Sequence, residues 1–223
     1  MTFSLVARCR ETGMFGVAVA SSSPAVSARC AHARAGVGAV ASQNVTDPAL
    51  GARALDLMAG GATAAEAVAI LARQPHAAWR QILAVDGAGV TGLHSGPKAL
   101  GTWSAARGPD VASGGNLLAD PSVPDAIVAG FTAATGHLGD RLIAAMQAGL
   151  AAGGEAGPIH SAGMKLVREV DWPVADLRID WTEGDPIAEL AALWTLYAPQ
   201  LDAYVTRALD PSAAPSYGVP GDE

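Results

Sequence analysis

Two segments near the start of the chain decide its fold, Thr2–Arg8 (TFSLVAR) and Gly13–Ser21 (GMFGVAVAS). Both contain β-branched and aromatic residues, and the short stretch Glu11-Thr12-Gly13 between them has the composition of a turn. The pair predicts an antiparallel hairpin whose first strand begins directly after the initiator methionine.

Strand and helix patterns follow this hairpin in blocks. Gly36–Gln43 is apolar and small throughout, as in a strand that is covered on both faces, whereas Ser22–Ala35 has no clean period and is interpreted as a loop or short helix. Thr63 and Glu66 form the sequence signature of a capping box at a helix start. The remaining expected helices and strands lie within residues 49–58, 63–72, 81–94, 102–112, 124–134, 140–151, 161–169, 176–180 and 186–209.

This order of elements favours one fold class. Strand runs and paired helices do not alternate strictly, so a doubly wound parallel sheet is disfavoured. The expected fold is α+β, a four-layer αββα sandwich of antiparallel sheets. Residues 1–209 are expected to form one domain, and residues 210–223, which contain three prolines and two glycines, have the composition of a linker.

The charge content bears on partners. Charged residues make up 16% of the chain, against about 25% in an average soluble protein. This low content predicts that surface is buried against another subunit, in a homodimer or larger oligomer. A net charge of −7 argues against a nucleic-acid partner, which would require a cluster of Lys and Arg.

Membrane, metal and cofactor signals are missing from the sequence. No apolar run reaches about 18 residues and no signal peptide is recognisable, so we expect no membrane partner and a cytoplasmic location. The two cysteines form no CxxC pair, and the five histidines show no ligand spacing, so a metal site is not expected. Nucleotide-binding glycine motifs are absent as well, and no cofactor is expected.

Four motifs carry a family resemblance: MTFSLVAR, GVAVASSS, ARAGVGAVASQ and ASGGNLLAD, in this order. Over residues 1–202 the chain resembles an uncharacterised bacterial family, a domain of unknown function with an N-terminal-nucleophile (Ntn) hydrolase-like αββα sandwich. The resemblance implies a fold rather than a demonstrated reaction.

Ntn hydrolases use an N-terminal Thr, Ser or Cys whose side chain attacks an amide carbonyl while its own α-amine accepts the proton. The resemblance therefore implies that Thr2 is the nucleophile after removal of Met1, in an amidohydrolase acting on a small amide or peptide-like compound. A β-branched residue that merely starts a strand is the alternative for Thr2. If Met1 is retained, the amine becomes an amide, and the chain is then a non-catalytic small-molecule binding protein or a structural subunit.

The resemblance also suggests one supporting residue, and the chemistry of a glycine-rich stretch suggests another. Threonine-nucleophile members carry a basic residue, normally Lys, about thirty positions after the nucleophile, and Arg34 stands at that place. Arginine supplies positive charge but cannot act as a base. Gly115 and Asn116 combine backbone that can approach a ligand with an amide that can donate to an oxyanion, although a tight turn capped by Asn would have the same sequence.

Polar residues at expected strand ends complete the candidate site. Serines and amides there are plausible substrate clamps, although turns have the same composition. A histidine at a strand end could titrate near neutrality, although a structural role is more common. The candidate substrate-binding residues are Ser21, Ser22, Ser42, Gln43, Asn44, Gly115 and His94.

Overall fold

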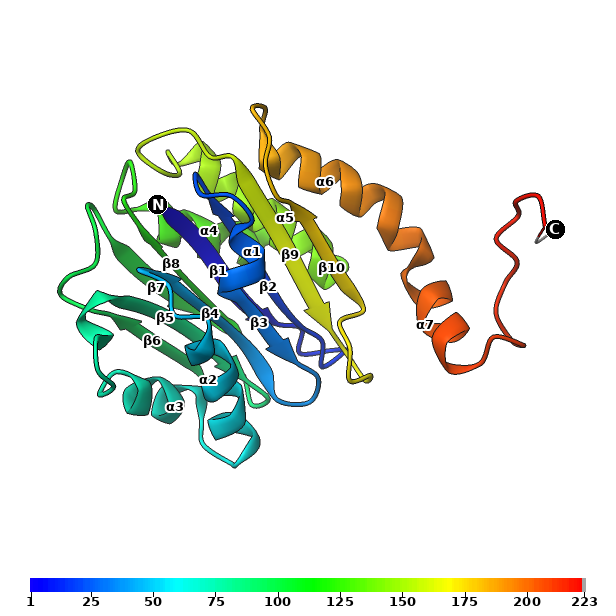
Figure 1. The fold of residues 1–223 in the computed structure, drawn as a ribbon, viewed down its shortest axis with the longest axis horizontal. Helices are drawn as coiled ribbons and strands as arrows, with labels where there is room; N and C mark the ends of the chain where they lie inside the picture. The colour runs from blue at the N-terminus through cyan, green and yellow to red at the C-terminus, as the bar shows by residue number, and fades with distance from the viewer. Residues whose placement is uncertain (222–223) are drawn as a thin grey trace.

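A computed structural model describes residues 1–221 and contains two antiparallel sheets (Figure 1). The six-stranded sheet has the order β10-β9-β2-β1-β8-β7, and the four-stranded sheet has the order β3-β4-β5-β6. The strands are β1 (Thr2–Arg8), β2 (Phe15–Ser21), β3 (Ala31–Arg34), β4 (Gly38–Asn44), β5 (Arg80–Asp86), β6 (Thr91–Ser95), β7 (Ser104–Gly108), β8 (Val111–Asn116), β9 (Ser161–Val167) and β10 (Ala175–Ile179).

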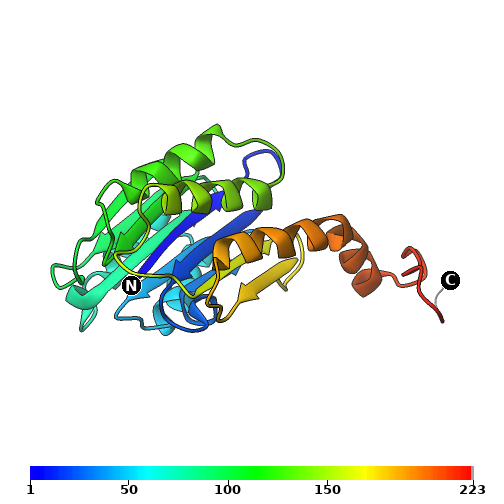
Figure 2. The same cartoon turned by 90° about the horizontal axis from the view of Figure 1, so that it is seen from above.

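Helices cover the outer faces of both sheets and give four layers (Figure 2). One group packs on the six-stranded sheet: α4 (Val123–Ala133), α5 (Leu138–Ala151) and α6 (Pro186–Tyr197). A second group packs on the four-stranded sheet: α2 (Ala49–Ala59) and α3 (Ala64–Leu71). A short helix, α1 (Val26–Cys30), connects β2 to β3. The expected α+β sandwich of αββα type is confirmed.

Alternate side chains of β1 belong to different hydrophobic cores. Odd positions of β1, such as Phe3 and Leu5, belong to the core under α4 and α5, whereas Val6 belongs to the core between the sheets. Thr2 and Ser4 share the inter-sheet face with Val6. The space between the sheets is therefore apolar along most of β1 and polar at its beginning.

Close approach of the two sheets requires a glycine in β8. A Cβ added at Gly114 would lie 2.9 Å from Leu83 Cδ2 and 3.4 Å from Gln81 Nε2 on β5. A larger residue would displace the Leu83 and Gln81 side chains that fill the space between the sheets. Ser113–Asn116 is thus the end of a buried strand and not a tight turn.

Several element boundaries differ from the expectation. Residues 22–35 contain the strand β3 in addition to a short helix. The third expected strand begins two residues later, at Gly38, because Gly36 turns the chain with a φ of 69°. The last helix is interrupted at a 3-10 turn, η2 (Ala198–Gln200), before α7 (Leu201–Leu209), because Pro199 has no N–H for the helical ladder. The capping box of Thr63 and Glu66 is confirmed.

The C-terminal part of the chain extends away from the sandwich (Figure 1). After α7, residues 210–221 run mostly exposed, and the Arg207 guanidinium lies 3.7 Å from the Tyr217 ring centre. None of the helices within residues 1–221 is long and apolar enough to cross a membrane.

Candidate active site

Thr2 lies at the buried start of β1, with 6% of its surface exposed. It is the first residue of the strand and faces the space between the sheets, where its cross-strand partner on β8 is Asn116. On the other side, its Oγ1 is 3.3 Å from Ser21 Oγ at the end of β2. The structure therefore brings Thr2, Ser21 and Asn116 together.

The carbonyl oxygen of Met1 is the common acceptor in this group. The hydroxyls of Thr2 and Ser21 both donate hydrogen bonds to it. Ser21 Oγ also accepts a hydrogen bond from the backbone N–H of Ser23 at 3.0 Å. The carbonyl of the Met1–Thr2 peptide bond is thus held by two hydroxyl groups, one of which accepts a backbone hydrogen bond itself.

Asn116 is 1% exposed and is held by a glutamine that sequence reasoning did not single out. Its Nδ2 donates to Gln81 Oε1 at 3.3 Å. An amide nitrogen carries two hydrogens, so one remains for a second acceptor near Thr2.

A buried chain of amides extends behind Asn116. Ser4 Oγ donates to Gln43 Oε1 at 2.6 Å, and Gln43 Nε2 donates to Gln81 Oε1 at 2.8 Å and to the carbonyl of Gly114 at 3.1 Å. Gln81 Nε2 donates to the carbonyl of Gly115 at 3.1 Å. Buried amides that find partners in this way fix the positions of their neighbours. Gln43 therefore helps to hold Gln81, and through it Asn116, in position.

Glu155 is a functional candidate that sequence reasoning missed. It lies in the loop between α5 and β9 and is 5% exposed, and both of its carboxylate oxygens accept from the backbone N–H of Ser22 at 3.2 Å. Burial raises the pKa of Glu155 to about 7, although the positive charge of the Met1 amine, the Ser22 hydrogen bonds and His160 act in the opposite direction. A single glutamate among the glycines of a loop has no sequence signal that distinguishes it from a solvated one.

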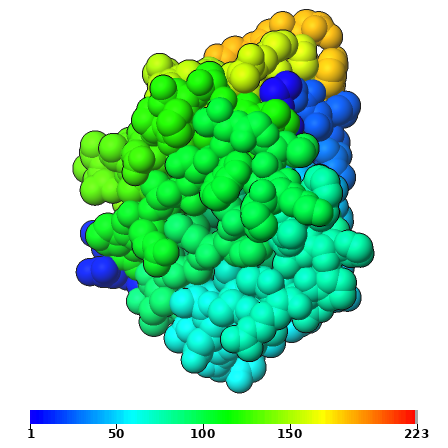
Figure 3. Space-filling model, turned by 90° about the vertical axis from the view of Figure 1, so that its left-hand side faces the viewer, coloured from blue at the N-terminus to red at the C-terminus, as the bar shows by residue number. Residues whose placement is uncertain are grey.

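The loop that carries Glu155 closes over the beginning of β1. Glu155 forms a β-bridge with Leu118, and the backbone N–H of Ala156 donates to the carbonyl of Leu117 at 3.0 Å. Gly157 lies against the Met1 side chain, because an added Cβ would be 3.3 Å from Met1 Cε. In Figure 3 a dark-blue patch of the N-terminal segment reaches the surface beside the yellow segment that precedes β9.

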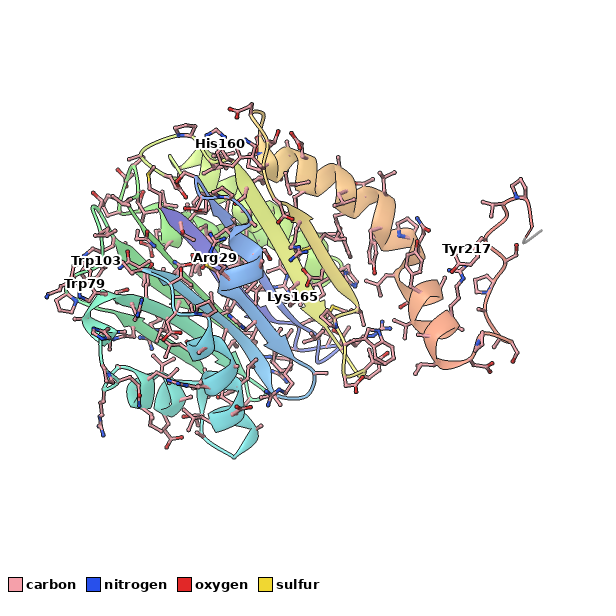
Figure 4. All side chains as sticks on the ribbon, viewed as in Figure 1. Arg29, Trp79, Trp103, His160, Lys165 and Tyr217 are labelled. Atoms are coloured by element: carbon pink, nitrogen blue, oxygen red, sulfur yellow. The ribbon has the colours of Figure 1, made fainter. Side chains whose placement is uncertain are left out.

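His160 directly precedes β9, which starts at Ser161 (Figure 4). Its backbone N–H donates to the Ser21 carbonyl at 2.9 Å, and its ring stacks on Trp181 with 4.3 Å between centroids. The ring Nδ1 lies 2.8 Å from the carbonyl oxygen of Thr182. His160 is thus fixed next to Ser21, on the same side as Glu155.

The structure does not bring Arg34 to Thr2. Arg34 pairs with Gly38 in the register of β3 and β4, whereas the site lies near Gln43, five positions further along β4. Its guanidinium is exposed and binds Asp56 Oδ1 of α2 at 2.8 Å. This placement, at the opposite end of the sheet, does not fit the supporting role expected of Arg34.

Four other candidates also lie outside the group around Thr2. Ser42 and His94 face the helices α2 and α3, because side chains alternate along a strand and Gln43 and Leu93 face the other way. Ser42 Oγ donates to the Asp47 carbonyl at 3.0 Å. His94 Nε2 lies 2.9 Å from the Ala77 carbonyl oxygen. Asn44 ties two loops together through the Trp79 carbonyl at 2.6 Å and the Leu100 N–H at 3.2 Å. A Cβ added at Gly115 would point to the helix side of the sheet, 2.5 Å from Leu118 Cδ2.

A metal centre requires several ligands in one place. Among residues 1–221, no three His, Cys, Asp or Glu side chains come together in a way that would hold a metal ion. The polar group around Thr2 consists of hydroxyls, amides and one carboxylate, which suits proton transfer and carbonyl recognition.

Taken together, the fold and this site define an αββα sandwich with a polar cluster at the buried start of a central strand. The chain belongs to a family of unknown function, DUF1028, whose model matches residues 2–190.

Two solved structures are similar to the chain. The crystal structure of a DUF1028 protein from Silicibacter pomeroyi has 28% sequence identity and a TM-score of 0.82, covering 88% of this chain and 89% of that chain. Anbu, the ancestral beta-subunit from Yersinia bercovieri, has 10% identity and a TM-score of 0.39, covering 91% of this chain and 97% of that chain. No curated protein matched the sequence.

Proposed function

We propose that this protein is an N-terminal-nucleophile amidohydrolase that cleaves a small amide or peptide-like compound after Met1 has been removed. The observation that carries the proposal is the position of Thr2, which starts a central strand with its hydroxyl among Ser21, Asn116 and the Met1 carbonyl. Removal of Met1 converts the Thr2 nitrogen into a free amine next to that hydroxyl.

The reaction has two halves. Thr2 Oγ1 forms a bond to the substrate carbonyl carbon while its proton passes to the Thr2 α-amine, and the carbon–nitrogen bond of the substrate then breaks as that proton moves to the leaving amine. A water molecule next attacks the resulting ester. It gives one proton back to Thr2 Oγ1 through the amine and releases the carboxylic acid.

Asn116 and Ser21 have separate tasks in this scheme. The remaining Nδ2 hydrogen of Asn116 stabilises the oxyanion that forms during attack, a role in which one donor is worth about 100- to 1,000-fold in rate. Ser21 Oγ, 3.3 Å from Thr2 Oγ1, orients the nucleophile. Arg34 has no part, because it binds Asp56 at the other end of the sheet.

One observation favours a second candidate, in which Met1 stays attached and the chain binds a small molecule without catalysis. The Met1 carbonyl accepts two hydrogen bonds, and its side chain packs against Gly157. These contacts would hold a permanent N-terminal residue equally well.

Two preparations of the protein distinguish these functions, one beginning with Met1 and one beginning with Thr2 after treatment with a methionine aminopeptidase. Intact mass defines each form. We expect amide hydrolysis only from the form that begins with Thr2. Equal turnover by both forms would exclude Thr2 as combined nucleophile and base.

Substitution of Thr2 tests the hydroxyl separately. Thr2→Ala should abolish turnover, because loss of the nucleophile raises the activation barrier by several kcal/mol, on the order of 10³-fold or more in rate. Thr2→Ser keeps a hydroxyl and should retain part of the turnover. Stability should change by at most about 1 kcal/mol, the range of β-propensity at a strand start. Unchanged turnover in Thr2→Ala would contradict the proposal.

A further inference from the structure

Met1 is an aminoacyl group bound at the candidate site. Its carbonyl oxygen accepts from the Thr2 and Ser21 hydroxyls, and its side chain lies against Gly157. Glu155 accepts from the backbone N–H of Ser22, next to the Ser21 that holds the Met1 carbonyl, and the charge of the Met1 α-amine reaches this carboxylate. All three parts of an amino acid residue therefore have neighbours at the site.

The covalent arrangement is close to that of a reaction intermediate. Met1 is joined to the nitrogen of Thr2, whereas the acyl group of the proposed intermediate would be joined to Oγ1 of the same residue. These two atoms are separated only by Cα and Cβ, and the Met1 carbonyl already hydrogen-bonds to Oγ1. An acyl group on the oxygen would accordingly find the same surroundings as Met1.

Glu155 is the acidic neighbour of the Met1 amine. Glu155 is buried with one backbone donor, Ser22, although a carboxylate can accept about four hydrogen bonds. Glu155 and Gly157 also line a hollow of about 290 Å³ that has Asp185 in its wall. His160, which carries positive charge only when protonated, lies 3.8 Å from the exposed carboxylate of Glu183.

We infer that the substrates are α-aminoacyl amides, and that Glu155 recognises the free α-ammonium group next to the carbonyl that Thr2 attacks. This inference rests on the proposed function and names its substrate class. A buried carboxylate is costly to keep ionised unless a cation pairs with it. A substrate ammonium would supply that cation, whereas an N-acylated amino acid would not.

The acyl side chain has its own contact surface. Gly157 touches the end of the Met1 side chain, and the adjoining hollow leaves space beside it. Gly157→Val would place a branched Cβ 3.3 Å from the Met1 methyl carbon and crowd the end of a long acyl side chain. Methionine and leucine amides should therefore lose more from this substitution than alanine amides.

The kinetic test compares methionine p-nitroanilide with its N-acetyl derivative, using the form of the protein that begins with Thr2. Wild type should prefer the free amine by at least about 30-fold in kcat/KM, the effect of removing one partner from a buried charge pair. Glu155→Gln should remove this preference by lowering kcat/KM for the free amine alone. Gln keeps an acceptor for the Ser22 N–H, so a thermal melt should show a folded protein.

Two results would overturn the inference. One is equal or better cleavage of the N-acetyl compound by wild type. The other is a Glu155→Gln variant that loses activity toward both compounds equally, since a merely structural role would not depend on the substrate charge. A Glu155→Asp variant should recover part of the preference, because it restores the negative charge.

A binding measurement separates failure of this inference from failure of the proposed function. Titration calorimetry with methioninamide and N-acetylmethioninamide uses Thr2→Ala protein that begins at residue 2, so no turnover is required. Selective binding of methioninamide that Glu155→Gln abolishes supports the inference even if Thr2 is not a nucleophile. Equal binding of both amides by Thr2→Ala contradicts it, whatever the activity of the wild type.

Discussion

Glu155 makes the free energy of unfolding depend on pH. Its pKa rises from 4.5 to about 7 on folding, so the folded protein holds this proton more tightly than the unfolded chain does. The resulting stability is fully present below about pH 4.5 and is lost as the pH rises through about 7. The loss should amount to at most about 3 kcal/mol, from 1.36 kcal/mol per pKa unit.

Denaturant unfolding at about pH 5 and pH 8 measures this effect. Wild type should lose more stability between the two conditions than Glu155→Gln, which has no proton to release at this position. Other groups titrate in both proteins and cancel in the difference. Parallel pH profiles would show that Glu155 is not perturbed in the folded state.

Residue positions also show what the sequence could and could not reveal about the site. Thr2 and Ser21 were predictable because they begin and end strands with a clear apolar pattern. Asn116 was expected beyond a strand within residues 102–112, whereas it is the last residue of β8. Arg34 was misplaced because its expected location depended on spacing along the chain, whereas the turn at Gly36 puts it at the far end of the sheet. Glu155 was missed because its burial results from a long-range loop closure.

At the scale of elements, β5 supports β8 through Gln81. Its Nε2 lies within 3.2 Å of three acceptors, Ser95 Oγ and the carbonyl oxygens of Ser104 and Gly115, and its Oε1 accepts from Gln43 and Asn116. Gln81→Leu would leave several buried polar groups without a partner, and we expect it to lower the free energy of unfolding by roughly 2–4 kcal/mol. It should also reduce turnover, because Asn116 loses its acceptor.

Ser95→Ala is the matched control for Gln81→Leu. It removes one peripheral partner of the same glutamine at 3.0 Å and should cost about 1 kcal/mol or less. Denaturant unfolding of both variants measures the difference. A Gln81→Leu protein as stable as the Ser95→Ala protein would show that the amide chain does not hold the two sheets together.

Element types were predictable from the sequence where periodicity was strong, as in the first hairpin and in α2 to α5. The strand β3 was not, because Ala31–Arg34 is short and contains His32 and Arg34, so no apolar alternation marks it. The break before α7 was masked because the amphipathic pattern continues on both sides of Pro199. Pairing with β4 makes Ala31–Arg34 a strand, and the proline ends the helix before α7.

At the scale of the whole molecule, the low charge content predicts association. The C-terminal part of the chain adds an observation, since large apolar residues are exposed both on α6 and α7 and on the arm that follows them, residues 210–221. They are Leu196 and Leu209 on the helices and Tyr217 and Val219 on the arm. Sedimentation should give a mass of at least twice 22.4 kDa, with an interface of more than about 1,000 Å². A protein that sediments only as a 22.4 kDa monomer would contradict this prediction.

Deletion of residues 210–223 separates the arm from the sandwich. Because residues 210–221 are mostly exposed, their removal should change the free energy of unfolding by less than about 0.5 kcal/mol, as for other surface changes. If the arm carries the subunit contact, the shortened protein should sediment as a smaller species. An unchanged mass would assign the contact to another surface.

Covalent trapping shows whether Thr2 is the nucleophile. The form that begins with Thr2 is mixed with the p-nitrophenyl ester of methionine, quenched with acid and mapped by tandem mass spectrometry. We predict a methionyl group on Thr2 that hydroxylamine removes, as expected for an ester on Oγ1, and no such group in Thr2→Ala. A hydroxylamine-sensitive adduct on Ser21 or another residue, with Thr2 unmodified, would contradict the claim.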